Sequence, residues 1–552
     1  MWNVAAWAQL STIPPLVVLQ LLPLLRRRDE DVASRSNWSK ALDRVAWRLQ
    51  DELAYSWGTN IEWIFGIGWT LFLIMLALAG TGGSMRFTPD PFALSMYQFV
   101  NTRQDFIQFT RHVGLVAVSQ LPTCTLLAVK THWSPFQQLL RVSHQELDPF
   151  HRVIGRVIVF LGVLHSVMYV AFLAKTQRMA RRIQDFEVVL GLFAGLALIH
   201  VGVLSSAKAR RQSYQFFVGM HHVMVLSLLI LLFFHVASTR LYVLESALVY
   251  VINMVSRGRA TNIVEAEIIP DAHPTVTSIS VLNKAGLVSS YSSGTYAYLS
   301  PKHKTLRANL WARFFSNPFT VAVNPRAGRL EFHIKNRGAR TNALRGLPEK
   351  ARLAVEGPYG TGIFSEALCS DTDRVLLVAG GIGATYALAV AETIVLKLGD
   401  HDLYSARRRV QVVWVVRSHD DTSWGPGLFE PQKSDTKRPT LGDVTTIFVT
   451  GSNRRNQKED DEDLSALLDS EEDSVSLEPR GGTGGQLSPQ TRLGRPDLRA
   501  IVDDFFRDSS EKERVAVLSC GPVGICRDLR REVGRFVARG REVRWHEERF
   551  GQ

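Results

Sequence analysis

The amino-acid sequence predicts a multi-domain protein in which an α-helical membrane bundle is followed by a small antiparallel β-barrel and an α/β nucleotide-binding domain. The chain has 552 residues, which is enough for two or three domains. Nearly all of its long apolar runs lie in residues 1–256, and short β-rich runs begin near residue 260. Apolar strands that alternate with helical patterns follow, so we place the domains at 1–256, 260–368 and 369–552.

Composition narrows the class of protein. Hydrophobic residues make up 46% of the chain and mean hydropathy is +0.01, but these averages combine two unlike halves. The net charge is +12, and basic residues cluster beside apolar runs, as at 26–28 and 208–211. This placement is typical of membrane anchors that face an anionic leaflet, and it argues against nucleic-acid binding. Four cysteines without a CxxC pair exclude a disulfide scaffold and favour a reducing, cytosolic location for the soluble half.

Seven apolar runs are candidate membrane spans, so we expect an integral membrane protein with the lipid bilayer as its partner. With residue 257 on the cytosolic side, seven spans place the N-terminus outside. The loops 26–60, 130–152 and 206–215, rich in Lys and Arg, then lie inside, as the positive-inside rule requires. One basic loop, 175–182, faces outward, and removing one span would move it. The predicted spans are 4–25, 61–79, 112–129, 153–174, 186–205, 216–236 and 240–255.

Two pairs of histidines lie in or beside these spans with the same spacing. His151 and His165 are 14 residues apart, and so are His221 and His235. Fourteen residues of helix rise about 21 Å and return a side chain to within roughly 40° of its starting face. Both helices run outward in the predicted topology, so His151 and His221 share an inner level, and His165 and His235 an outer level. Each level then offers two imidazoles to one iron, the ligation of an electron-transfer haem.

The histidine beside His221 is the alternative ligand. His222 is 13 residues from His235, which would set the two side chains about 140° apart on a regular helix. We therefore prefer His221, although a π-bulge would reverse that choice. The competing interpretation is that such histidines are polar residues bonded to neighbouring helices, and we assign His112 and His200 to it. Matching spacing on two parallel helices favours haem for the other four.

The predicted barrel contains two segments of interest, of which the second has the chemistry of a phosphate site. Strands are expected at 277–282, 320–323 and 330–334, and the segment Asn317-Pro318-Phe319-Thr320 opens the second of them. Residues 335–341 combine cations, a glycine and a hydroxyl where a strand turns into a helix. Such a turn presents backbone N–H groups and positive charge to a pyrophosphate. Either segment alone would be a common turn.

The α/β domain carries a second set of glycine turns. We expect 356–360 to be a compact loop that closes the barrel. The apolar strand 374–379 then ends in Gly380-Gly381-Ile382-Gly383-Ala384-Thr385 and is followed by a helix at 386–398, an arrangement that presents a helix N-terminus to phosphate. A second strand, 410–416, ends in Arg417, which is suited to a 2′-phosphate and therefore to NADPH. A third strand, 515–518, leads into Cys520-Gly521-Pro522 and a helix at 523–538.

Residues 451–497 are acidic and then rich in Gly, Ser and Thr. Because few of them are apolar, we interpret this stretch as a disordered insert in the nucleotide domain. A solvated loop without function is the preferred interpretation. The alternative is a regulatory segment that contains Ser465, Ser470 and Ser474.

Taken in order, these motifs resemble the fungal ferric reductase family, part of the superfamily that includes the NADPH oxidases. The resemblance covers roughly residues 60–552. Residues 151–156 are similar to the entry of the family's haem helix and 216–235 to its other haem helix, while Asn317 stands where the family usually has histidine. Ala389 replaces a proline that many relatives carry.

The resemblance implies a ferredoxin-reductase-like barrel and named cofactor residues. Cys520 would lie near the position of hydride transfer, and the aromatic Phe550 of the C-terminal tail by the flavin ring, which makes them the candidate catalytic residues. The FAD candidates are Asn317, Pro318, Phe319, Thr320, Lys335, Gly338 and Thr341. The NADPH candidates are Gly357, Pro358, Gly360, Gly380, Gly381, Gly383, Thr385, Arg417, Cys520, Gly521 and Pro522.

These expectations together predict an electron-transfer enzyme. Electrons would pass from cytosolic NADPH through FAD and two b-type haems to ferric or cupric chelates on the far side of the membrane, with the plasma membrane as the expected location. A superoxide-generating NADPH oxidase is the alternative, and a seven-span receptor or channel without haem or flavin is the non-enzymatic one. No feature of the sequence identifies an iron-uptake partner. The acceptor sequence for N-glycosylation at Asn37 lies on the cytosolic side and is expected to stay unmodified.

Overall fold

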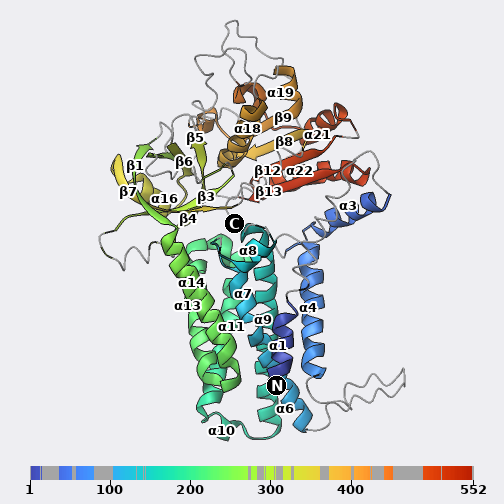
Figure 1. Ribbon diagram of the computed structural model, residues 1–552, viewed down its shortest axis with the longest axis vertical. Coiled ribbons are helices and arrows are strands. Elements are labelled where there is room, and N and C mark those ends of the chain that lie inside the picture. Colours follow the sequence, from blue (N-terminus) through green and yellow to red (C-terminus); the bar gives the residue numbers. More distant parts are fainter. Residues whose placement is uncertain are drawn as a thin grey trace.

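The computed structural model describes, apart from a few single positions, twelve stretches of the chain. They are residues 2–12, 37–52, 58–79, 103–270, 275–282, 291–305, 315–324, 329–360, 372–398, 403–424, 440–451 and 489–549. A helical bundle forms one end of the molecule, and two β-containing domains form the other (Figure 1).

Four helices in the described part of the chain are long and apolar enough to cross a membrane. Each coincides with a predicted span. Their lengths lie between 19 and 32 residues, which is long enough to cross the apolar core of a bilayer. Their bounds are α4 (Asn60–Ala79), α9 (His144–Lys175), α11 (Phe186–Leu204) and α13 (Tyr214–His235). The N-terminal half therefore contains a membrane-spanning bundle, as predicted.

The other three predicted spans have a different form. The run 112–129 is divided between α6 (Arg103–Ser119) and α7 (Leu121–Leu127), because Pro122 in the first turn of α7 lacks the N–H that would continue α6. The run 240–255 lies in α14 (Arg240–Arg259), which is not among the four most apolar helices. Of the run 4–25, α1 (Trp2–Leu10) is described, and most of the remainder lies outside the described residues.

The helices alternate in direction (Figure 1). α9 and α13 run away from the soluble domains, whereas α11 and α14 return toward them, so α9 and α13 are parallel, as predicted. The short helix α10 (Met179–Arg182) lies at the far end, which places the basic loop 175–182 opposite the soluble domains. Three further helices lie toward the soluble domains: α3 (Asn37–Leu49), α8 (Pro135–Leu140) and α12 (Ala207–Gln212), and a 3₁₀ turn, η3 (Ala237–Thr239), precedes α14.

The barrel is a seven-stranded antiparallel sheet with the order β4-β3-β7-β1-β2-β6-β5. Predicted strands at 277–282 and 330–334 are confirmed as β2 and β6, but the one at 320–323 is interrupted at Val321. The segment 356–360, predicted as a loop, is instead the end of a ten-residue strand, since β7 continues to Tyr359. The elements are β1 (Thr261–Pro270), β2 (Val276–Leu282), β3 (Tyr296–Pro301), β4 (Asn317–Thr320), β5 (Ala322–Asn324), β6 (Arg329–Lys335), α16 (Ala339–Arg345) and β7 (Lys350–Tyr359).

The third domain is built on a six-stranded parallel sheet with the order β11-β10-β9-β8-β12-β13. The predicted strands 374–379, 410–416 and 515–518 and the helix 523–538 are confirmed. Its strands are β8 (Arg374–Gly380), β9 (Val410–Val416), β10 (Thr445–Val449), β11 (Gln490–Leu493), β12 (Val515–Gly521) and β13 (Val543–Arg549). Its helices are η5 (Gly381–Gly383), α18 (Ala384–Leu398), α19 (Leu403–Arg409), η6 (His419–Thr422), η7 (Leu441–Val444), α21 (Leu498–Arg507) and α22 (Val523–Ala538).

One strand falls inside the predicted insert. β11 pairs in parallel with β10, so residues 490–493 belong to the sheet, whereas 452–488 lie outside the described residues. The central strands are buried on both faces. One face of β8 and β12 packs on α18, and the other packs on α21 and α22. Parallel strands covered on both sides read as continuous apolar runs, which is why these strands are visible in the sequence.

A buried ion pair joins the bundle to the barrel. Arg257, near the end of α14, donates from Nε to Glu356 Oε1 of β7 at 2.6 Å, and Tyr359 donates to the same oxygen at 2.7 Å. Both side chains of the ion pair are buried. Burial alone would raise the pKa of Glu356, but the Arg257 guanidinium and the donated hydrogen bonds hold it below the usual glutamate value.

A second cation completes this junction. Lys130, which follows α7, donates to the buried Tyr298 hydroxyl of β3 at 2.7 Å and lies 4.2 Å from the centre of the same ring. Removal from water, together with the positive charge of the neighbouring Arg257, lowers the pKa of Lys130 to about 8. Strands β7 and β3 of the barrel are thus held to two different parts of the bundle, the end of α14 and the segment after α7.

We expect Glu356→Gln to lower the free energy of unfolding by about 3 kcal/mol, because it leaves the buried Arg257 guanidinium without a charged partner. Thermal unfolding of the purified protein in detergent measures the change. Glu265→Gln, on an exposed part of β1, is the control and is expected to have no effect. Equal unfolding temperatures for the two variants would show that the ion pair does not hold the junction.

Lys130 predicts a pH dependence of stability. The unfolded chain has the ordinary lysine pKa of 10.5, and the folded chain a value of about 8. Between these values the unfolded state binds more protons, so stability should rise as pH increases from about 8 to about 10. Unfolding temperatures across this range, compared with those of Lys130→Met, measure the effect. Parallel curves for the two proteins would contradict it.

Candidate functional site

The inner histidine pair lies where α9 and α13 face one another. The ring centres of His151 and His221 are 6.4 Å apart, with the ring planes at 76°. Bonds between a metal and an imidazole nitrogen are about 2 Å long, so two rings that face each other across one metal ion have centres roughly 6 Å apart. The observed separation therefore fits a single iron between them.

The second ring nitrogen of each candidate ligand is already engaged. His151 Nδ1 donates to the backbone carbonyl of Cys124 at 2.9 Å, and His165 Nδ1 donates to the backbone carbonyl of Thr110 at 2.7 Å. His235 donates to the carbonyl of Glu187 at 2.7 Å, and His221 lies 3.4 Å from the Ser205 hydroxyl. For His151, His165 and His235 the partner is a carbonyl, which only accepts, so the proton sits on Nδ1 and the lone pair of Nε2 is left for a metal.

The outer pair is placed by two glycines. A Cβ added to Gly114 of α6 would lie 2.8 Å from the His165 ring, and one added to Gly191 of α11 would lie 2.5 Å from the His235 ring. Any larger residue at either position would displace an imidazole. The pairing predicted from the spacing is thus compatible with the packing at both levels.

The remaining histidines have different partners. His222 and His200 each bond a carbonyl four residues earlier in their own helix, and His112 bonds the Ala77 carbonyl of α4. The ring that lies 6.4 Å from His151 is that of His221 and not that of His222. Among the described residues, no group of three or more His, Cys, Asp or Glu side chains could hold a metal. Paired imidazoles suit a haem, since the macrocycle supplies the other four ligands.

The predicted flavin segments of the barrel lie together beside α13. Asn317, Pro318, Phe319 and Thr320 form β4, Lys335 ends β6, and Gly338 caps α16. The Thr341 hydroxyl accepts from the N–H groups of Arg337 and Gly338, at 3.0 and 3.1 Å, and so fixes the turn between strand and helix. This confirms the predicted strand-to-helix turn.

Two neighbouring residues that the sequence analysis did not identify tie this turn to the bundle. Arg340 of α16 donates to the Phe315 carbonyl and lies 4.8 Å from the centre of the Phe315 ring. The same ring packs against Gly219 of α13, where an added Cβ would lie 2.5 Å from it. Gly219 precedes His221 by two residues. The segment leading into β4 therefore contacts the helix that carries the inner histidine.

The glycine turns of the third domain are packed backbone to backbone. Gly380 ends β8, and Gly521 ends the adjacent parallel strand β12 with φ +148°. A Cβ on Gly521 would lie 2.9 Å from the backbone N of Gly380, and one on Gly383 would lie 2.6 Å from the Cys520 carbonyl. Side chains are thus excluded where the carboxyl ends of the two strands meet. That edge is where open parallel sheets bind nucleotides.

The other candidates of this domain surround the same edge. Thr385 donates to the Ile382 carbonyl at 2.9 Å, Pro522 packs against Gly380, and Arg417 follows the end of β9 with its side chain exposed. Cys520 is fully buried in the core beside α18, where burial raises the pKa of its thiol well above the ordinary value. The thiol is therefore neutral. Phe550 lies outside the described residues.

The turn at the end of β7 connects the barrel to this edge. Gly360 packs on Tyr296, and its Cβ position is 3.5 Å from the carbonyl of Gly294. Gly294 in turn approaches the ring of Tyr386 in α18, which stacks on His546 of β13 with ring centres 5.9 Å apart. Gly357 and Pro358 lie in β7, just before its last residue. Tyr386 and His546 were not predicted, since neither lies in a recognisable motif.

Comparisons with known proteins agree with this architecture. Residues 113–232 match the family model of the ferric reductase like transmembrane component, and residues 372–534 match that of the ferric reductase NAD binding domain. A relative described as probable metalloreductase AIM14, from Meyerozyma guilliermondii, is 22% identical over 419 residues, or 76% of this chain and 79% of that protein. Dual oxidase 2 of Sus scrofa is 22% identical over 511 residues, which cover 84% of this chain but 30% of the oxidase.

Among solved structures, a flavohemoglobin from Malassezia yamatoensis with bound FAD and heme aligns with a TM-score of 0.37 and 13% identity, covering 81% of this chain and 98% of that one. The two family models fall on the two parts of the chain where the histidine pairs and the glycine turns lie. The chain therefore belongs to the superfamily of membrane ferric reductases and NADPH oxidases.

Proposed function

We propose that this chain carries electrons across a membrane, from NADPH through FAD and two b-type haems to ferric or cupric chelates on the far side. The observation that carries the proposal is the arrangement of two histidine pairs on α9 and α13. His221 of the inner pair is two residues from Gly219, which contacts Phe315 of the barrel. A chain of carriers needs such adjacency, because each electron must pass between neighbouring groups held at fixed distances.

The residues divide the task between them. When bound, FAD converts the hydride of NADPH into single electrons, which the haems carry one at a time. His151 and His221 hold the inner iron, and His165 and His235 the outer one, with each imidazole oriented by its Nδ1 hydrogen bond.

The barrel and the third domain position the two nucleotides. The turn at 335–341 would offer the cations Lys335 and Arg337 to the flavin pyrophosphate, and residues of β4 would contact the flavin. The glycine edge of β8 and β12 holds NADPH, and Arg417 contacts its 2′-phosphate. Cys520 acts through the shape of its backbone and not as an acid or base, since its thiol is neutral and buried. Phe550 is proposed to cover the flavin ring.

The orientation follows from the source of NADPH. The barrel and the third domain are placed in the cytosol, and the plasma membrane is the proposed location. The relative described as a metalloreductase supports a metal chelate as acceptor. The match to dual oxidase 2, which covers 84% of this chain, makes reduction of O₂ to superoxide the second candidate.

Visible spectra of the detergent-purified protein test the proposal. We expect a low-spin b-type haem signal that is reduced by NADPH without oxygen and reoxidised by ferric citrate. Haem that is reoxidised only by oxygen would favour the oxidase. A purified protein without haem would contradict both candidates.

The inner histidine pair predicts a selective loss of haem. We expect His221→Ala to retain only one of the two haems per chain, since His151 then has no partner ligand. His222→Ala is the matched control and should retain both, because the ring that lies opposite His151 is that of His221. Haem content and the reduced-minus-oxidised spectrum measure the difference. Loss of haem in the control alone would assign the ligand to His222.

Arg417 predicts the choice of nicotinamide cofactor. A hydrogen bond to a charged group contributes about 1.5–3 kcal/mol, so Arg417→Ser should raise KM for NADPH roughly 10- to 100-fold and leave KM for NADH unchanged. Arg407→Ser is the control, because Arg407 lies in α19, which precedes the start of β9, whereas Arg417 follows its end. Steady-state oxidation of both cofactors measures the ratio. An equal effect on the two cofactors would show that Arg417 does not contact the 2′-phosphate.

A further inference from the structure

Helix α3 has two opposite faces, and only one of them is covered. Trp47 packs against Gly534 of α22, and the Arg530 guanidinium lies 4.2 Å from the centre of the Trp47 ring. Arg530 also donates to the Trp47 carbonyl at 2.8 Å and pairs with Asp51 at 3.3 Å. This face fastens α3 to the third domain. Trp545 of β13 completes the contact, with its ring centre 5.7 Å from that of Trp47.

The opposite face is apolar and exposed. Trp38, Leu42 and Val45 are exposed to 80%, 63% and 53%. Their spacing of four and three residues forms a single stripe along a helix. A large apolar stripe turned to solvent is unusual in a soluble protein, and it indicates a surface that contacts another apolar phase.

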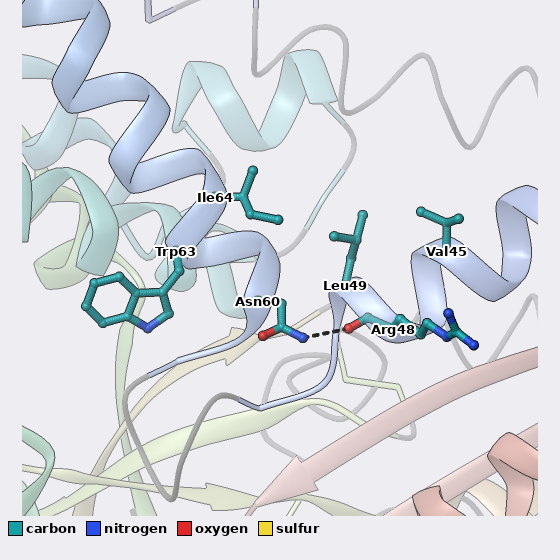
Figure 2. Close-up of a pocket in the computed structure, with 6 residues that line it drawn as sticks. All are labelled: Val45, Arg48, Leu49, Asn60, Trp63 and Ile64. Atoms are coloured by element: carbon teal, nitrogen blue, oxygen red, sulfur yellow. Dashed lines mark hydrogen bonds between the residues drawn. The ribbon is translucent and has the colours of Figure 1, made fainter.

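The stripe continues into the lipid-facing surface of α4. Val45 and Leu49 of α3 and Ile64 of α4 line one open apolar hollow, in which Figure 2 shows all three pointing into the same space. Below Ile64, the exposed residues Ile67 and Leu71 continue along α4, a helix that crosses the membrane. Asn60 fixes the angle between the two helices by donating to the Arg48 carbonyl at 2.9 Å.

Charge beside the stripe fits an anionic surface. Arg44 and Arg48 lie between the apolar stripe and the face that carries Trp47, and both are exposed. Lys40 lies on the opposite face, beside Gly540 of the third domain. A helix with an apolar face and a flanking line of cations lies in the plane of a membrane, with its apolar side chains among the acyl chains. Figure 1 places α3 between α22 and the level at which α4 begins, which is where such a plane would pass.

We infer that α3 is a lipid-binding strap: its stripe of Trp38, Leu42, Val45 and Leu49 docks on anionic phospholipid of the leaflet facing the soluble domains, while Trp47 and Asp51 hold the third domain. Lipid contact at α3 therefore fixes the distance of the nucleotide domain from the bilayer. The inference goes beyond the proposed electron transfer, because it concerns the membrane surface and needs neither haem nor flavin.

A fluorescent label tests the strap in the full-length protein. An environment-sensitive label is attached at Leu42→Cys in a Cys369→Ser background, since Cys124, Cys520 and Cys526 are buried. The protein is reconstituted in nanodiscs of phosphatidylcholine, with or without about 30 mol% phosphatidylserine. We expect nitroxide-labelled acyl chains to reduce the emission roughly by half in the anionic discs. The same label at Leu396→Cys, exposed on α18, is the control and should be unaffected.

Charge reversal supplies the second measurement. Arg44→Glu with Arg48→Glu should weaken docking on anionic discs about 25-fold, at about fivefold per basic residue, and remove the difference between the two lipids. A label at Leu42→Cys that is water-exposed in both kinds of disc would overturn the inference. So would a label shielded from both water and nitroxide, which would assign the stripe to a protein partner or a second copy. Haem and flavin content, read from the same samples, test the proposed function separately.

Discussion

The buried pair of Arg257 and Glu356 is the interaction on which the arrangement of the whole molecule depends. It joins α14, the last helix of the bundle, to β7 of the barrel, and it does so out of contact with water, where an unpaired charge would be strongly unfavourable. Separating the bundle from the barrel would break this ion pair and leave each charge without its partner. Held in this way, Phe315 reaches Gly219, and the barrel approaches the inner histidine level. A chain that must pass electrons between domains requires this fixed junction more than it requires any particular surface.

Glycine has a matching role inside each domain. Gly114 and Gly191 leave room for imidazoles between helices, and Gly383 and Gly521 let two strand ends approach each other. In both places the absent Cβ defines a space whose shape is set by backbone and is therefore rigid. The membrane bundle and the nucleotide domain thus use the same device to position different groups, histidine side chains in one and the ends of two strands in the other.

Much of this could be predicted from the sequence, because the signals are local. The strands at 374–379 and 410–416 are visible as continuous apolar runs, and helix 523–538 as apolar residues at helical spacing. The two histidine pairs are visible through their equal spacing. The end of β7 was wrongly predicted as a loop, since glycine and proline usually interrupt strands, whereas here the strand is held by pairing with β1 and β3. The contacts of Arg257, Phe315 and Tyr386 were not predictable. Each joins residues distant in sequence, and no short pattern records such a pairing.

The equal spacing on α9 and α13 also constrains how the bundle can change over time. Inserting one residue between His151 and His165 would turn the outer side chain by about 100° and shift it by about 1.5 Å, and its counterpart at His235 would stay in place. A compensating insertion in the other helix would be needed in the same lineage. The two helices therefore cannot drift in length independently, and insertions and deletions should accumulate in the connecting segments and be absent between the paired positions.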